Sequence, residues 1–246
     1  MLNATYLDRE NAVTLVFLHG IFGKNEQLQF FFDLPYNIIA VDLPGHGKSS
    51  SCSTSSVLTC VRERLQETLN HYNIKEHVLF GYSLGGYIVA DLLAHGWECA
   101  GAVILSAGVN LPRLELMDRF HVLSHAQRIL PEYQELFERA VDTFRRLHEV
   151  PFSVRGELDV SEALMFLGAL KQAERASSLS SVRCPVLLLH GKKDVVVPSE
   201  NSHELKKQFS NARLIEFDSL DHGSVLRSDQ VRSAIQEFVH NLSLDQ

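Results

Sequence analysis

The sequence predicts an α/β fold, a doubly wound and mostly parallel sheet with a helical cap inserted into it. Three observations predict this class: short apolar, β-branched runs recur along the chain, helical stretches lie between them, and the polar motifs directly follow the runs. Such runs are typical of strands buried on both faces of a parallel sheet, whose ligands bind beyond the carboxyl ends of the strands. A functional site is therefore expected at that edge.

The expected core strands are the apolar runs at residues 14–18, 37–41, 77–80, 102–105, 185–189 and 213–217. The residues before Thr14 leave room for one more strand. Residues 49–56 are rich in serine and predict a solvated loop before a helix over 57–69. A second helix is expected directly after Ser83, with Gly96 available as its C-terminal cap.

The alternation of strands and helices stops between Leu111 and Val182. This interval of roughly 70 residues is too long for a structureless connection in a compact domain. Apolar residues between Tyr133 and Leu147 recur at helical spacing, and 163–170 is apolar nearly all round. We expect an α/β core over 1–111 and 182–246 and a helical cap over 112–181. Its apolar helices either cover the cleft or pack on the core.

Composition narrows the possible partners. The chain has 246 residues, a formal net charge of −7 and a pI near 5.9, which disfavours binding to nucleic acid. We expect no membrane span and a cytoplasmic location, because the N-terminus lacks a basic and apolar signal and no apolar stretch reaches the roughly 20 residues of a span. The four cysteines lack CxxC spacing, so we expect reduced thiols, no zinc site and no disulfide framework. No metal or cofactor is predicted.

The motif Gly81-Tyr82-Ser83-Leu84-Gly85 follows the apolar run Val78-Leu79-Phe80 and opens a helical stretch. This order predicts a nucleophile elbow, a sharp strand-to-helix turn that presents a serine hydroxyl. Such a turn crowds the residues two before and two after the serine, and Gly81 and Gly85 lack the Cβ atoms that would clash. Ser83 is therefore the predicted nucleophile, and it needs a nearby base.

Five motifs occur in one order along the chain: His19-Gly20-Ile21-Phe22-Gly23, the stretch from Asp42 to Ser49, the elbow, the stretch from Gly191 to Pro198, and Asp221-His222-Gly223. In this order the chain resembles the α/β-hydrolase superfamily, specifically its small, capped members with a serine nucleophile. The resemblance spans nearly the whole sequence. It implies a cap after the sixth core strand of the family and the chain order nucleophile, acid, histidine.

The resemblance implies His222 as general base and Asp194 as the carboxylate that orients it, with Asp221 and Asp218 as rivals for the latter role. His19 and His46 lie in family loops and are expected to be structural, whereas nothing in the spacing assigns a role to His190 or the remaining histidines. 

The oxyanion of a tetrahedral intermediate needs backbone donors, which the resemblance places at Ile21 and Leu84. The expected substrate pocket is lined by Phe22 of the first loop and by Leu164, Phe166 and Leu167 of the cap.

We therefore expect a serine hydrolase that acts on a small carboxylic ester or thioester through an acyl-enzyme, with a small molecule or an acyl carrier as substrate. A carbon–carbon bond hydrolase or lyase is an alternative, although the lyase of this kind carries Arg after Gly-Tyr-Ser-Leu-Gly-Gly and this chain has Tyr87. An acyltransferase, or a small-molecule receptor that keeps the triad, are further alternatives.

Overall fold

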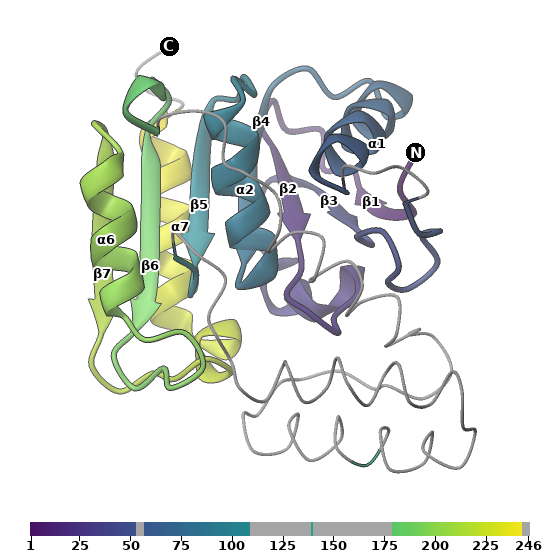
Figure 1. Ribbon diagram of the computed structural model, residues 1–246. Helices are drawn as coiled ribbons and strands as arrows, with labels where there is room; N and C mark the ends of the chain where they lie inside the picture. The colour runs from purple at the N-terminus through teal and green to yellow at the C-terminus, as the bar shows by residue number, and fades with distance from the viewer. Residues whose placement is uncertain (53–56, 109–138, 140–178, 243–246) are drawn as a thin grey trace.

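Seven strands form a single sheet in the computed structural model, which describes residues 1–52, 57–108, 139 and 179–242 (Figure 1). The strands are β1 (Ala4–Leu7), β2 (Thr14–Leu18), β3 (Asn37–Val41), β4 (His77–Tyr82), β5 (Gly101–Leu105), β6 (Val186–Gly191) and β7 (Ala212–Phe217). Their order across the sheet is β1-β3-β2-β4-β5-β6-β7. All neighbours pair in parallel except β1, which is antiparallel to β3 and pairs Ala4 with Val41.

The chain winds outward from β2 to β3 and then returns to place β4 on the other side of β2. This reversal between β2 and β4 is the switch point at which open α/β sheets bind ligands. The register aligns Leu18 with Gly81, so the loops that follow β2 and β4 leave the sheet side by side. The observed topology confirms the predicted fold class.

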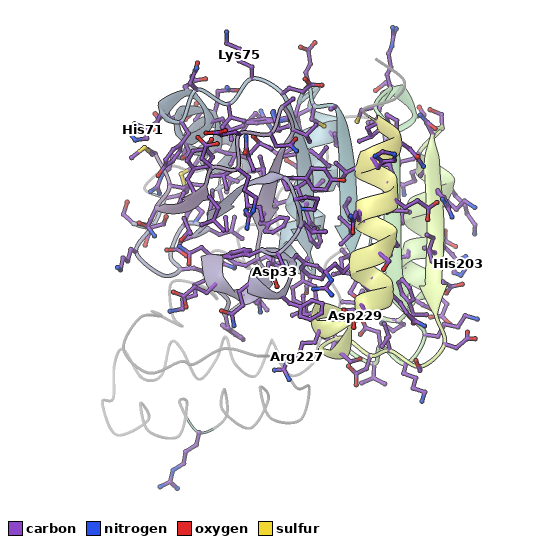
Figure 2. The ribbon with its side chains drawn as sticks, turned by 180° about the vertical axis from the view of Figure 1, so that it is seen from behind. Asp33, His71, Lys75, His203, Arg227 and Asp229 are labelled. Carbon is purple, nitrogen blue, oxygen red and sulfur yellow. A yellow bond between two sulfur atoms is a disulfide. The ribbon has the colours of Figure 1, made fainter. Side chains whose placement is uncertain are left out.

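Helices cover both faces of the sheet (Figures 1 and 2). Helices α1 (Val57–His71), α2 (Leu84–Ala94) and α6 (Glu200–Gln208) lie on one face, and α7 (Asp229–Leu242) lies on the other with the 3₁₀ segment η1 (Asn25–Phe31). Alternate residues of each strand pack into the apolar clusters on the two faces of the sheet, because successive side chains point to opposite faces. Val16 and Leu18 join the first cluster, and Leu15 and Phe17 join the second. Each is at most 1% exposed.

The predicted elements match the observed ones closely. All six expected strands are present, β1 fills the space before Thr14, and the helix expected over 57–69 continues to His71. Gly96 follows α2 with a φ of 78°, as expected of a C-terminal cap. The short segments η2 (Leu179–Ser181) and η3 (Ser224–Arg227) complete the described elements. The cap expected over 112–181 lies outside the described residues, apart from residue 139 and η2.

The cysteines differ from the prediction. Cys52 and Cys60 form a disulfide with their Cα atoms 6.2 Å apart, so the expectation of four reduced thiols without a disulfide is wrong. The reason is local: Cys60 lies in the first turn of α1, and Cys52 precedes it by only 8 residues. Among the described residues, no helix combines the length and apolar character needed to cross a membrane.

Candidate active site

Ser83 lies between the end of β4 and the start of α2, with φ of 51° and ψ of −113°. A positive φ is rare for a residue other than glycine and marks a sharp, strained turn. The turn brings backbone very close to backbone. A Cβ on Gly81 would lie 2.3 Å from the main-chain oxygen of Gly85, and a Cβ on Gly85 would lie 2.1 Å from that of Leu18. Glycine is therefore required at both positions for this elbow to form.

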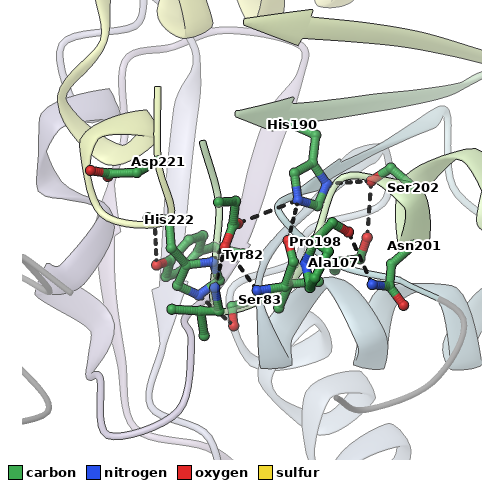
Figure 3. A network of polar contacts seen from close by, with 12 residues as sticks. Tyr82, Ser83, Ala107, His190, Pro198, Asn201, Ser202, Asp221 and His222 are labelled. Carbon is green, nitrogen blue, oxygen red and sulfur yellow. Dashed lines mark hydrogen bonds and ion pairs between the residues drawn. The ribbon is translucent and has the colours of Figure 1, made fainter. Parts of the chain in front are cut away.

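The structure brings Ser83, His222 and Asp194 together in one hydrogen-bonded line (Figure 3). His222 Nε2 lies 3.1 Å from Ser83 Oγ, and His222 Nδ1 lies 2.7 Å from Asp194 Oδ2. His222 follows β7, and Asp194 follows β6. Both side chains are nearly buried, at 6% and 4% exposed, whereas Ser83 is partly accessible.

Asp194 accepts hydrogen bonds on both carboxylate oxygens. Its Oδ1 accepts the backbone N–H groups of Val196 at 2.9 Å and Val197 at 2.8 Å, and its Oδ2 faces His222 and, at 3.3 Å, Nε2 of His190. Burial alone would raise the pKa of Asp194, but the bonds from His190 and His222 hold that pKa well below its usual range. An ionised carboxylate can only accept, so the proton of the His222–Asp194 bond resides on Nδ1 and leaves Nε2 free to accept from Ser83.

The two rival carboxylates point elsewhere. Asp221 Oδ1 accepts from the backbone N–H groups of Gly223 and Ser224 and from the Ser224 hydroxyl, and in Figure 3 Asp221 lies apart from the imidazole. Asp218 is exposed and pairs with Lys192 at 2.7 Å. Of the three aspartates considered from sequence, Asp194 is the one that contacts the His222 ring.

Two residues that sequence reasoning missed hold this line in place. The Tyr82 hydroxyl donates to the main-chain oxygen of His222 at 2.8 Å, and the two rings lie 5.1 Å apart. His190 is fully buried and contacts Asp194, the Val197 main-chain oxygen at 2.7 Å and the Ser202 hydroxyl. The sequence offered only their positions as a signal: Tyr82 directly precedes Ser83, and His190 is the last residue but one of β6.

The loop after β2 and the start of α2 meet beside Ser83, as the close approach of Gly85 to Leu18 and His19 shows. This contact places the predicted oxyanion donors, Ile21 and Leu84, on adjoining segments. Within the described part of the chain, neither backbone N–H has a hydrogen-bond partner. Unpaired backbone N–H groups on two such segments are the kind of donor that an oxyanion requires.

His19 anchors the loop that follows β2. Its Nδ1–H donates to the Gly20 main-chain oxygen at 2.7 Å, and its Nε2 accepts the Leu43 N–H at 3.0 Å. Burial lowers the pKa of His19 to about 4, so the ring is neutral at pH 7. His46 lies 5.0 Å away, ring to ring, and burial together with His19 lowers its pKa to about 3. Both have the geometry of structural histidines.

Of the four residues expected to line the substrate pocket, the structure describes Phe22. Phe22 is 2% exposed, has a φ of 59° and packs in the same apolar cluster as Leu84 and Tyr87. The other three, Leu164, Phe166 and Leu167, lie outside the described residues. Within those residues, no group of three or more His, Cys, Asp or Glu side chains is arranged to hold a metal ion.

The parallel sheet, the turn at Ser83 and the loops around it have the arrangement of an alpha/beta hydrolase, and a comparison with known protein families gives the same result. The model of the alpha/beta hydrolase family matches residues 15–234, and the chain belongs to this family.

The relatives differ in activity. The 2-succinyl-6-hydroxy-2,4-cyclohexadiene-1-carboxylate synthase of Pectobacterium atrosepticum is 31% identical over 199 residues, which cover 74% of this chain and 78% of that protein. Among solved structures, MenH from S. aureus has a TM-score of 0.78 at 20% identity, over 99% of this chain and 100% of that chain. The esterase EaEST from Exiguobacterium antarcticum has a TM-score of 0.76 at 19% identity, over 98% and 95%. These structural likenesses show the fold.

Proposed function

We propose that this protein is a carboxylic ester hydrolase that forms an acyl-enzyme at Ser83. The observation that carries the proposal is the continuous line from Ser83 Oγ through His222 to Asp194, with contacts of 3.1 and 2.7 Å. A serine hydroxyl is a weak nucleophile until a base accepts its proton, and this line supplies the base and fixes its tautomer.

In the proposed acylation step, Ser83 Oγ attacks the ester carbonyl carbon while His222 Nε2 takes the hydroxyl proton. Asp194 stays ionised and stabilises the resulting imidazolium. The carbonyl oxygen becomes an oxyanion that accepts from the N–H groups of Ile21 and Leu84. One such donor is worth about 3 kcal/mol of barrier in other enzymes, so two free donors favour this chemistry.

The intermediate then collapses, and His222 returns its proton to the leaving alcohol. Water occupies the vacated position, gives a proton to His222 and attacks the acyl-enzyme, which releases the carboxylic acid and restores Ser83. Tyr82 keeps the His222 main chain in place through both half-reactions, because its hydroxyl bonds a main-chain oxygen rather than the reacting imidazole.

A lyase activity like that of the synthase from Pectobacterium is the second candidate, favoured by 31% identity to that enzyme. The product named for that enzyme carries a succinyl group and a ring carboxylate, so a site for it needs cationic side chains. At the position where the sequence interpretation expects arginine for this lyase, the chain has Tyr87, which is 6% exposed and packs in an apolar cluster. This difference favours an uncharged ester as substrate.

The proposed pocket extends from Phe22 to a helical cap over 112–181, in which Leu164, Phe166 and Leu167 contact the acyl chain. The apolar character of 163–170 supports this proposal. If it is right, Phe166→Ala changes the preference among acyl lengths more than it changes the rate on acetate esters. An equal loss on every ester, together with lower thermal stability, would place Phe166 in the core instead.

The central test combines covalent labelling with turnover. A fluorophosphonate probe should label Ser83, identified by mass spectrometry of the tryptic peptide, and p-nitrophenyl esters of increasing acyl length should be hydrolysed. Ser83→Ala is the matched control and should lose both signals while it keeps its melting temperature. Labelling at another serine would refute the nucleophile assignment. Labelling at Ser83 without ester turnover, but with formation of the succinyl cyclohexadiene product from its precursor, would establish the lyase instead.

A further inference from the structure

The four cysteines form two pairs. Cys52 is bonded to Cys60, and the free thiols of Cys99 and Cys184 lie 3.8 Å apart, sulfur to sulfur. Cys99 and Cys184 are 85 residues apart in sequence, so their contact is a product of the fold. Both are half-buried and pack against the same apolar cluster, together with Trp97.

The sheet holds the two thiols in this position. Cys99 lies just before β5 and Cys184 just before β6, and these strands pair in parallel from Ala102 opposite Val186. The Ala102 N–H also donates to the main-chain oxygen of Pro185 at 3.0 Å. Since a disulfide has its sulfurs about 2.05 Å apart, the two sulfur atoms at 3.8 Å need to approach by less than 2 Å, a displacement of the size that a change of side-chain rotamer produces.

We propose that Cys99 and Cys184 are a second disulfide site, an intramolecular dithiol that small disulfide oxidants such as glutathione disulfide convert to a cross-link between β5 and β6. The pair lies at the amino ends of these parallel strands, whereas Ser83 lies at the carboxyl end of β4. A bond there closes a loop that contains the whole interval between β5 and β6, including residues 109–178.

The chemistry follows from which thiol loses its proton first. A hydrogen bond from Cys99 lowers the pKa of Cys184, whereas the contact with Cys184 and burial raise the pKa of Cys99. The thiolate is the attacking species in disulfide exchange. The Cys184 thiolate therefore attacks the oxidant, forms a mixed disulfide and releases one glutathione thiolate. Cys99 then gives up its proton and attacks the Cys184 sulfur, and the second glutathione thiolate leaves. The two protein thiols are oxidised, and one glutathione disulfide is reduced to two glutathiones.

The existing disulfide supports this proposal. Any environment that sustains the Cys52–Cys60 bond also exposes the second pair to oxidant. Trp97, the single tryptophan of the chain, lies two residues before Cys99 and donates to His77 at 2.9 Å, so its fluorescence reports on this region.

Trypsin separates the two pairs cleanly. Cys52 and Cys60 share peptide 49–62, whereas Cys99 lies in peptide 76–113 and Cys184 in peptide 184–192. After the folded protein is treated with glutathione disulfide and alkylated, we expect peptides 76–113 and 184–192 to run as one linked species. Reduction should separate them. The melting temperature should rise by about 5–10 °C on oxidation, as expected for closure of a long loop, and the Trp97 fluorescence should change. Hydrolysis of an activated ester should not change.

The matched variant is Cys99→Ser, in which Cys184 should remain as a mixed disulfide with glutathione and the rise in melting temperature should vanish. The same pair of measurements in a Cys52→Ser, Cys60→Ser background removes any contribution of the first disulfide. The proposal is wrong if folded wild-type protein keeps both thiols alkylatable, if the mixed disulfide at Cys184 never resolves, or if the linked peptides form only after denaturation. None of these outcomes depends on whether the protein hydrolyses esters.

Discussion

Replacing Asp194 with asparagine tests the third member of the proposed triad. The amide oxygen of asparagine can keep the two bonds that Oδ1 accepts from Val196 and Val197, and the amide NH₂ then replaces the oxygen that faces His222. The opposite orientation of the amide would aim NH₂ at two backbone N–H groups and lose two buried hydrogen bonds, each worth about 1 kcal/mol. The amide therefore presents a donor to His222 Nδ1.

A donor at that position forces the other imidazole tautomer. His222 Nδ1 must then accept, its proton moves to Nε2, and Nε2 can no longer accept from Ser83 at 3.1 Å. The same substitution in the best-studied serine triad costs about 10⁴ in kcat, which corresponds to about 5.4 kcal/mol of barrier. We expect a loss of this order for Asp194→Asn, with KM nearly unchanged, because the carboxylate does not touch the substrate.

The assay is steady-state hydrolysis of one activated ester, with active sites counted by a fluorophosphonate probe. Asp221→Asn is the matched control. Its amide oxygen still accepts from the N–H groups of Gly223 and Ser224, and its carboxylate makes no contact with the imidazole ring, so kcat should stay within about threefold of wild type. The reasoning is refuted if Asp221→Asn is the crippling change and Asp194→Asn turns over near normally.

Three further predictions concern the frame of the site. Gly85→Ala should abolish soluble, active protein, because its Cβ would lie 2.1 Å from a main-chain oxygen of β2. Gly96→Ala has open space and should cost only about 1 kcal/mol for its positive φ. The yield of soluble protein tests the first variant and chemical denaturation the second, and a soluble, active Gly85→Ala protein would contradict the argument. His19 and His46 should each remove about 3 kcal/mol of stability as the pH drops from about 6.5 to 4. An unfolded histidine takes up a proton near pH 6.5, whereas these buried rings do so only near their folded pKa values of about 4 and about 3. Melting temperatures between pH 7.5 and 4 measure this, and a flat profile would contradict it. Tyr82→Phe should lower kcat about fivefold by removing one hydrogen bond to the His222 main chain, and an unchanged kcat would show that Tyr82 has no positioning role.

The strands and the elbow were predictable because their signals are local. A run such as residues 14–18 is apolar on both faces and can be satisfied only by burial in a parallel sheet. The two glycines that flank Ser83 predict the sharp strand-to-helix turn from a segment of only five residues, Gly81 to Gly85. The match of Asp194 rather than Asp221 to the acid position followed from the family resemblance, since spacing alone left both open.

The contacts that escaped prediction all join segments distant in sequence or hidden in a loop. His190 points at Asp194 because the acid loop folds back over the end of β6, and no periodicity announces this reversal. The Cys99–Cys184 contact depends on the pairing of β5 with β6 across 85 residues. The spacing of Cys52 and Cys60 matches no metal or redox motif, so it gave no signal, although the start of α1 brings the two together. Long-range strand register decides the Cys99–Cys184 contact, and the local conformation of loops and helix starts decides the other two; one sequence displays neither.

The geometry of the site depends on backbone contacts at glycines more than on the side chains around it. Gly81 lets the end of β4 touch the start of α2, and Gly85 lets α2 touch the end of β2. At Gly191, a Cβ would lie 2.3 Å from the Leu220 main-chain oxygen, so the loop that carries Asp194 rests directly on the loop that carries His222. The first two contacts join the turn at Ser83 to the loop that carries Ile21, and the third joins the loop of Asp194 to the loop of His222. Because main-chain atoms set these distances, the geometry does not depend on the side chains of Ile21 and Leu84, whereas it does require the three glycines.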